Sequence, residues 1–339
     1  MNKECKSTKN KTQFMVVYNS PSINSFALLT KYNVDNVKKV RSTSETLKIR
    51  KKRDKGDISF LFVPNKVFLD GRVMQCFWFL IAKFAINVPK NADKKCIEEN
   101  STIYFTTEEL ASYLGLSRQK TFEVIKRAHA TLKEIEWVFK DDMNKSSKNN
   151  MMWSFTVIIG KGVGLRRGLY AFQLHPRFTE YLASTAIEYM PKQFFDLNPK
   201  LYPNSIAFAI KMISHFNMNS DDGSDVALTV GSLLGFAPAI PSYKDEVFLG
   251  EKIDGVVHTG RVMQRIIKPF LRDVSILEEV GVIANLAIYN GEKKVDYNAL
   301  KHVKHDDFAD YIVQYRVENY PIKKKKKENG EEESNEKAG

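Results

Sequence analysis

The hydrophobic residues of this chain recur at helical spacing in two separate stretches, and a similar series of shorter elements follows each stretch. In the first, residues 71–87, apolar side chains cover most of the helix circumference, which predicts a buried helix capped by Asp70. These side chains are Val73, Phe77, Trp78, Leu80, Ile81 and Phe84. A short strand is predicted over 103–105, directly before a second helical pattern.

This second pattern, residues 106–134 (TTEELASYLGLSRQKTFEVIKRAHATLKE), predicts two helices joined by a tight turn. Thr106 or Thr107 caps the first helix, and Gly115 ends it. The apolar stripe of this helix consists of Leu110, Tyr113 and Leu114. Ser117 is then in position to cap the second helix.

The second helix is basic. Phe122, Ile125 and Leu132 are predicted to face inward, while five basic residues and one acid, Glu123, lie between 118 and 133. A helix, a glycine turn and a basic helix form the helix-turn-helix pattern, whose second helix enters the DNA major groove. The alternative is an ordinary helical hairpin with a solvated basic face.

A glycine-rich basic loop follows at 160–168, between strands predicted at 152–159 and 169–174. This arrangement is the wing of a winged helix, with Lys161, Arg166 and Arg167 over the phosphate backbone. A nucleotide-binding phosphate loop does not fit, because no Gly-Lys-Ser/Thr follows and the loop opens a strand.

The second half of the chain repeats this plan. A helix at 205–216 corresponds to 71–87, a helix at 229–234 corresponds to 107–114, and Gly235-Phe236 corresponds to Gly115-Leu116. An insertion at 237–257 precedes a second basic helix, which begins near Thr259 and which Pro269 is expected to kink. A strand at 283–288 and a turn or short wing at 290–294 follow, whereas 308–320 fits either an amphipathic helix or a strand.

The predicted fold class is therefore α+β, with two tandem winged-helix domains. The predicted organisation is a basic mobile arm at 1–57, domain 1 at 58–185, a connector at 186–202 with a strand at 194–197, domain 2 at 203–320 with its inserted loop at 237–257, and a charged disordered tail at 321–339.

The charge is unevenly placed along the 339 residues. The net charge is +12, but residues 1–57 hold 14 Lys and Arg against 5 Asp and Glu, and residues 321–339 hold six against five. Only +2 therefore remains for 58–320. The total suits an anionic partner such as nucleic acid, and a DNA-binding face must come from local clustering.

The three cysteines, Cys5, Cys76 and Cys96, have no spacing typical of disulfides or zinc sites, which favours a reducing interior. The most apolar run, 73–88, is too short to span a bilayer, and the N-terminal stretch lacks the features of a signal peptide. We expect a cytoplasmic protein that does not bind membranes.

No catalytic or cofactor site emerges. The chain lacks the His-hydrophobic-His pair of rolling-circle nickases, and His258-Thr259-Gly260-Arg261, although it mimics a tyrosine recombinase motif, fits a recognition helix. His302 and His305, beside Asp306 and Asp307, are more typical of a solvated turn than of a metal site. We expect no enzyme activity, no metal and no cofactor.

The order of these elements resembles that of plasmid replication initiators of the iteron-binding Rep type. The resemblance is carried by TTEELASYLGLS in the first half, RVMQRIIKPFLRDVSIL in the second, and YMPKQFFDLNPKLYPNSIAFAIKMISHFN where those proteins join their domains. It covers about 58–300, and the 237–257 loop and the lysine-rich arm depart from the compact form of the family. A plasmid, phage or integrative-element origin stays open.

The resemblance implies an initiator that binds repeated sites in double-stranded origin DNA, helps to melt an adjacent A·T-rich region, and recruits the host initiator and helicase. It also implies that a homodimer represses its own promoter and that a monomer initiates replication. The residues themselves indicate something narrower: two basic helices reading two major grooves, over a site longer than one turn of about 10 bp.

The candidate DNA contacts lie on the two basic helices and the wing. Base-edge contacts are predicted from both helices, because arginine pairs well with guanine and glutamine with adenine. The candidates are Arg118, Gln119, Lys120, Thr121, Lys126, Arg127, Lys161, Arg166, Arg167, Arg261, Gln264, Arg265, Lys268 and Arg272. Two rivals use the same fold: a transcriptional repressor without a replication role, and an adaptor whose second domain binds protein.

Overall fold

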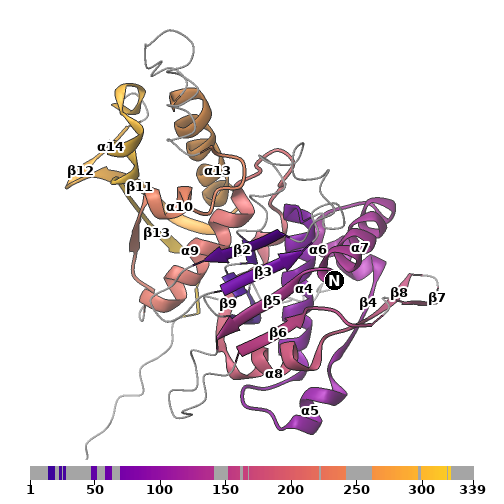
Figure 1. The fold of residues 1–339 in the computed structure, drawn as a ribbon. Helices are drawn as coiled ribbons and strands as arrows, with labels where there is room; N and C mark the ends of the chain where they lie inside the picture. Colours follow the sequence, from indigo (N-terminus) through magenta and orange to yellow (C-terminus); the bar gives the residue numbers. More distant parts are fainter. Residues whose placement is uncertain are drawn as a thin grey trace, which may run out of the picture.

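The computed structural model describes most of the chain between residues 14 and 321. The described ranges are 14–19, 23–24, 26–27, 47–51, 58–62, 69–140, 152–160, 163–166, 168–220, 223–241, 262–296, 299–318 and 320–321. Helices and strands are mixed in an α+β fold, and Figure 1 shows them gathered in two lobes. Each lobe is built around one long buried helix, α4 (Gly71–Asn87) in the first and α9 (Ser205–Asn219) in the second, and the two helices pack against each other.

Helix α4 forms as the sequence predicts. Oδ1 of Asp70 accepts a hydrogen bond from the backbone N–H of Val73 at 2.9 Å, which caps the first turn. Its apolar residues point in nearly all directions, so the helix is buried between the strands on one side and the helices α6 (Thr107–Leu114) and α7 (Arg118–Leu132) on the other. Burial of this many large side chains makes α4 the centre of the first lobe.

The first lobe holds two larger sheets. One has the strand order β4-β8-β7, and the other has the order β2-β3-β5-β6; all neighbours are antiparallel. The strands are β2 (Leu47–Lys51), β3 (Ile58–Phe62), β4 (Thr102–Thr106), β5 (Glu136–Lys140), β6 (Met152–Thr156), β7 (Val163–Arg166) and β8 (Leu169–Gln173). Two further helices, α5 (Lys94–Glu99) and α8 (Pro176–Ser184), pack together at the base of this lobe.

The second lobe has one sheet with the order β10-β13-β11-β12. Its strands are β10 (Val226–Thr229), β11 (Ile283–Asn290), β12 (Lys293–Lys294) and β13 (Ile312–Val317). Its helices beside α9 are α10 (Val230–Leu234), the π-helical turn η3 (Met263–Ile267), α13 (Lys268–Glu279), η4 (Ala299–His302) and α14 (His305–Ala309). Residues 308–320 thus end one helix and form one strand, β13.

The two lobes repeat a common arrangement of strands. In the first lobe β8 lies between β4 and β7, and in the second lobe β13 lies between β10 and β11. In both sets of three, the strand in the centre is the last one along the chain. Thr106 and Thr229 end the first strand and cap the following helix, accepting from the N–H three residues on at 3.0 and 3.2 Å. The internal repeat predicted from the sequence is therefore present in the strand order and in the capping residue.

The prediction of a mobile arm over 1–57 is wrong for part of that range. Strand β1 (Phe14–Asn19) pairs antiparallel with β9 (Ala186–Pro191), and β2 joins the larger sheet. Tyr18 is fully buried, and its hydroxyl donates to the Val88 carbonyl at 2.7 Å. The residues of β1, FMVVYN, are mostly β-branched or aromatic, which is typical of a strand, but the partner strand β9 is distant in the sequence.

The predicted wing is also paired differently. Strand β6 pairs with β5 in the other sheet, so the partner of β8 is β7, which lies inside the stretch predicted to be a loop. The predicted strand at 194–197 is instead the 3-10 helix η2 (Lys192–Phe195), preceded by β9. Residues 242–257 of the inserted loop and 322–339 of the predicted tail lie outside the described residues.

Pro269 has a structural consequence other than a simple kink. A proline cannot donate a hydrogen bond, and its ring crowds the carbonyl four residues earlier. The helix accommodates it by widening: Lys268 donates its N–H to Met263, five residues back, and the π-helical turn ends where α13 begins. The turn rotates the residues before Pro269 relative to those after it.

Candidate nucleic-acid interface

The outer surface of α7 is a ridge of four residues. At about 100° per residue, Gln119, Phe122, Glu123 and Lys126 share one side of the helix, and all four are exposed. The ammonium of Lys126 lies 4.3 Å from the centre of the Phe122 ring, a cation–π contact. The prediction that Phe122 faces inward is wrong, because the inward side is formed by Val124, Ile125, Ala128 and Leu132.

Thr121 belongs to that inward side and is not a base contact. Its side chain is fully buried, and its hydroxyl donates to the Ser117 carbonyl at 3.0 Å in the first turn of α7. The predicted role of Thr121 at a base edge is therefore wrong. On a helical wheel Thr121, Val124, Ala128 and Leu132 lie within one arc of about 80°, and Phe122 lies outside it.

Arg118 lies on the flank of α7 that faces the β7–β8 hairpin. Its Nε is 3.2 Å from Glu108, and its side chain is 64% exposed. Gly168, in the hairpin turn, has φ +81°, and a Cβ there would lie 3.3 Å from the Arg118 guanidinium. The N–H of Thr107 donates to the Gly168 carbonyl at 2.8 Å, so the hairpin is fixed to the start of α6. Arg166 ends β7 opposite Leu169, whereas Lys161 and Arg167 lie outside the described residues.

Lys120 and Arg127 lie on the opposite flank of α7. Lys120 is exposed, but Nη1 of Arg127 lies 2.7 Å from Oδ2 of Asp70, at the start of α4. Since this ion pair joins α7 to α4, the central helix of the lobe, Arg127 positions α7. The turn itself is as predicted: Gly115 has φ +60° and ends α6 in the left-handed region.

In the second lobe, the predicted residues line one surface of η3 and α13. Gln264, Arg265, Lys268 and Arg272 are exposed, while Ile266, Ile267 and Phe270 are buried on the other side. A shallow depression of about 430 Å³ is lined by Gln264, Lys268 and Arg272 together with Pro269, Leu271 and Ser275. Arg261 lies outside the described residues. Unlike Gly115, Gly235 has φ −59°, so the first turn of this second unit has a different form.

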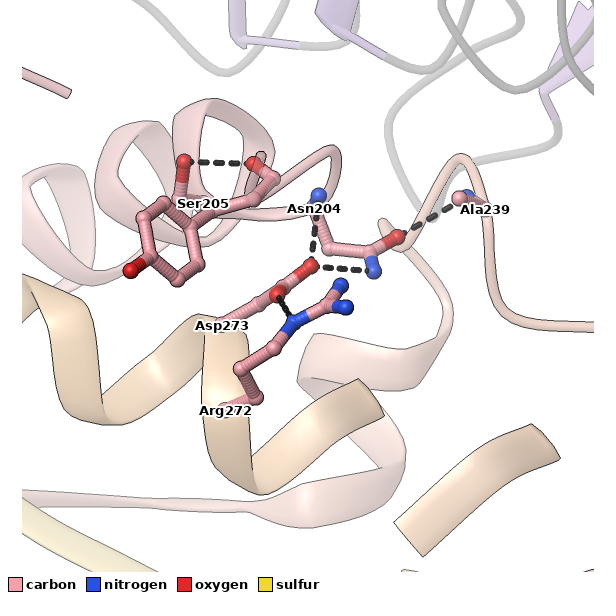
Figure 2. Close-up of polar contacts among 6 residues, drawn as sticks. Asn204, Ser205, Ala239, Arg272 and Asp273 are labelled. Atoms are coloured by element: carbon pink, nitrogen blue, oxygen red, sulfur yellow. Dashed lines mark hydrogen bonds and ion pairs between the residues drawn. The ribbon is translucent and has the colours of Figure 1, made fainter. Parts of the chain in front are cut away.

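The buried carboxylate of Asp273 binds Arg272 of this surface and Asn204 at the start of α9 (Figure 2). Asp273 is fully buried; its Oδ2 accepts from the backbone N–H and the side-chain amide of Asn204, at 2.9 and 2.7 Å. Its Oδ1 accepts from Nε of Arg272 at 2.6 Å, and this hydrogen bond raises the pKa of the Arg272 guanidinium. The side-chain oxygen Oδ1 of Asn204 in turn accepts from the backbone N–H of Ala239, near the start of the inserted loop, at 2.8 Å.

This network orients the Arg272 side chain. With Nε held by Asp273, the two terminal nitrogens Nη1 and Nη2 make no hydrogen bond to any residue that the structure describes, and the guanidinium lies 5.9 Å from the Tyr202 ring centre. A guanidinium fixed in this way presents two parallel donors to a phosphate or a guanine. Sequence reasoning missed Asp273, because one acid beside a basic residue carries no signal of burial.

Among the described residues, no cluster of three or more His, Cys, Asp and Glu side chains could hold a metal ion, and no helix has the length and apolar character needed to cross a bilayer. The side chains of His302 and His305 lie outside that description. The observed surface is thus one of exposed basic and amide groups on helices, whose donors suit phosphate oxygens and base edges.

No family model and no curated protein sequence matches this chain. Among solved structures, it is similar to the crystal structure of the Pi initiator protein in complex with iteron DNA, with a TM-score of 0.53 and 10% sequence identity. The match covers 92% of this chain and 100% of the other. At this identity the likeness concerns the fold, and it extends over both lobes.

Proposed function

We propose that this protein is a sequence-specific DNA-binding replication initiator, which recognises repeated sites in an origin through two winged helices. The observation that carries the proposal is the repeated arrangement of a long helix, a strand, a Thr-capped short helix, a helix with exposed basic residues and the strand order β4-β8-β7 or β10-β13-β11. The fold likeness to an initiator whose structure contains iteron DNA supports it.

In this proposal the recognition helices are α7 in the first lobe and η3 with the start of α13 in the second, each in a major groove. Gln119, Phe122 and Lys126 present an amide, a ring and a cation to base edges in the first site; a ring can contact a thymine methyl group and an amide can pair with adenine. In the second site, one amide and three cations are presented, by Gln264, Arg265, Lys268 and Arg272. The β7–β8 hairpin is the wing, with Arg166 near its tip over the phosphate backbone.

Two grooves on one face of DNA require a site longer than one helical turn, about 10 bp. The proposal includes the opening of adjacent A·T-rich DNA, recruitment of the host initiator and helicase, and a homodimer for promoter repression. These partners follow from the likeness to Rep initiators rather than from any contact in this chain.

The test is a binding titration of the full chain by fluorescence anisotropy, on a duplex carrying the repeats that flank its own gene and on an unrelated duplex. Gln119→Ala should lose about 1–3 kcal/mol of discrimination between the two. Lys126→Glu and Lys268→Glu should each weaken binding strongly, whereas Lys94→Glu, on α5 with a side chain 75% exposed, serves as the matched control.

Equal affinity for both duplexes would contradict sequence-specific recognition. Loss of binding with Lys126→Glu but not with Lys268→Glu would favour an adaptor whose second lobe binds protein. Specific binding to a single operator, without autonomous replication of a plasmid carrying the cognate DNA, would favour a transcriptional repressor.

A further inference from the structure

A cleft of about 500 Å³ lies beside α7, on the flank away from the β7–β8 hairpin. It is bounded by the start of α4, by α7, and by residues 198–200 of the segment that joins the lobes. Its charged lining consists of Asp70, Arg72, Lys120, Glu123, Arg127 and Lys200. None of the DNA contacts predicted from the sequence lies in the joining segment, so Lys200 is a new candidate.

The joining segment is held firmly against α4. Gln75, fully buried in α4, donates its amide to the carbonyls of Phe194, Phe195 and Leu197 at 3.0, 3.2 and 3.2 Å. Gly71 leaves room for Pro199: a Cβ at Gly71 would lie only 2.3 Å from that of Pro199. The position of the segment relative to α7 is therefore fixed by packing and hydrogen bonds.

The turn that carries Lys200 is built by Asn198. Its side-chain oxygen accepts from the N–H of Lys200 at 3.1 Å, and its carbonyl accepts from Tyr202 at 2.9 Å. Asparagine commonly shapes turns in this way. The backbone at Lys200 is therefore fixed by this turn, and the Lys200 side chain, which lines the cleft, is exposed to solvent.

The cations of the cleft differ in whether they already have hydrogen-bond or ion-pair partners within the protein. Arg127 pairs with Asp70, and Nη1 of Arg72 donates to Oε1 of Gln75 at 2.9 Å and to the Leu114 carbonyl at 3.2 Å. Lys120 and Lys200 form no ion pair with any described residue. Of the two carboxylates in the lining, Asp70 is paired with Arg127, and Glu123 forms no ion pair with a described residue. Two ammonium groups are consequently available to an anion.

The geometry of the major groove indicates which anion this is. A helix lying in the groove has one phosphate backbone on each flank. The hairpin and Arg118 occupy one flank of α7, and Lys120 and the cleft occupy the other. A phosphate of the second strand would therefore meet Lys120 and Lys200.

We propose that Lys200, together with Lys120, forms a phosphate-binding site for the DNA strand opposite the one contacted by the β7–β8 hairpin. The segment joining the two lobes is then part of the DNA-binding surface. This inference rests on the proposed function, in which α7 enters the major groove.

The test is the salt dependence of binding by Lys200→Ala, compared with the wild-type chain and with Lys94→Ala as control, on the repeat duplex and on an unrelated duplex. Loss of one phosphate contact should reduce the slope of log K against log salt by about 0.9. The affinity of Lys200→Ala should fall by the same factor on both duplexes, because a phosphate contact carries no sequence information. Glu123→Gln should raise the affinity, since it removes the carboxylate of the lining that is not paired with a described cation.

An unchanged slope for Lys200→Ala, with specific binding by the wild-type chain, would overturn this site while leaving the proposed function intact. A loss confined to the repeat duplex would overturn it too, because it would assign Lys200 to base recognition. Absence of specific binding by the wild-type chain would instead contradict the proposed function.

Discussion

Arg127 and Asp70 connect α7 to α4, the central helix of the first lobe. The guanidinium Nη1 lies 2.7 Å from Oδ2 of Asp70, while the other oxygen of the same carboxylate caps α4. The orientation of α7, and hence of its exposed ridge, therefore depends on a residue 57 positions away in the chain.

The two roles of Asp70 can be separated by substitution. Asp70→Asn keeps a cap and loses the ion pair, which is partly exposed and contributes about 1 kcal/mol or less. Asp70→Ala loses both and should cost about 1 kcal/mol more. Urea unfolding at neutral pH measures the difference; equal midpoints for the two variants would contradict the capping role.

Gly115 and Gly235 follow corresponding helices but differ in backbone conformation. Gly115 has φ +60° with open space around it, so Gly115→Ala should destabilise by about 1 kcal/mol through left-handed strain alone. Gly235 has φ −59°, and Gly235→Ala should be neutral or stabilising. Thermal unfolding of both variants tests this, and a larger loss for Gly235→Ala would contradict the assigned conformations.

The Asp273 network should respond unequally to loss of its members. Asp273→Ala leaves the buried donors of Asn204 unpaired and should cost about 3 kcal/mol or more. Arg272→Ala should cost about 1 kcal/mol, since both Asn204 donors still bind the carboxylate and the Arg272 side chain is half exposed. Denaturant unfolding of the two variants is the measurement, and similar losses would argue against the carboxylate as the centre of the network.

His175 should make stability depend on pH. Nδ1 of His175 accepts from the N–H of Arg177 at 3.2 Å and caps α8, and burial, followed by the charge of Arg177, lowers the pKa of His175 below its ordinary value of 6.5. Below pH 6.5 the unfolded chain therefore binds a proton that the folded chain does not, so stability falls as the pH falls and is retained above that value.

The pKa of His215 is lowered as well, by burial and then by Lys211, and it contributes in the same direction. His175→Asn keeps a capping acceptor without the titration, so it should reduce the loss of melting temperature between pH 7 and pH 5. The same loss in His175→Asn and wild type would contradict the role of His175.

The sequence predicted those parts of the fold that depend on local signals. The cap at Asp70, the turn at Gly115 and the apolar circumference of α4 lie where their residues indicate, because each acts over a few positions. Strand β1 was missed because its partner, β9, lies about 170 residues away, and the residues of β1 do not indicate which strand it pairs with. The pairing of β8 with β7 was missed for a different reason: β7 lies directly before β8, but the glycines and basic residues of 160–168 are typical of a loop.

The candidate interface was predicted in outline. The exposed cations of the candidate helices follow from charge and periodicity. Thr121 and Phe122 were assigned to the wrong sides of α7 because a threonine is usually exposed and a phenylalanine usually buried, whereas here Thr121 is buried and Phe122 is exposed. The roles of Arg127 and Asp273 depend on partners distant in sequence, Asp70 and Asn204. Such contacts have no periodic signature.

The central claim is that both lobes read DNA, and hydroxyl-radical footprinting on the repeats flanking the gene tests it most directly. We predict two protected segments per repeat, about 10 bp apart on one face of the duplex. Lys126→Glu should remove one segment and Lys268→Glu the other. A single short segment that is lost with Lys126→Glu and unaffected by Lys268→Glu would contradict the account.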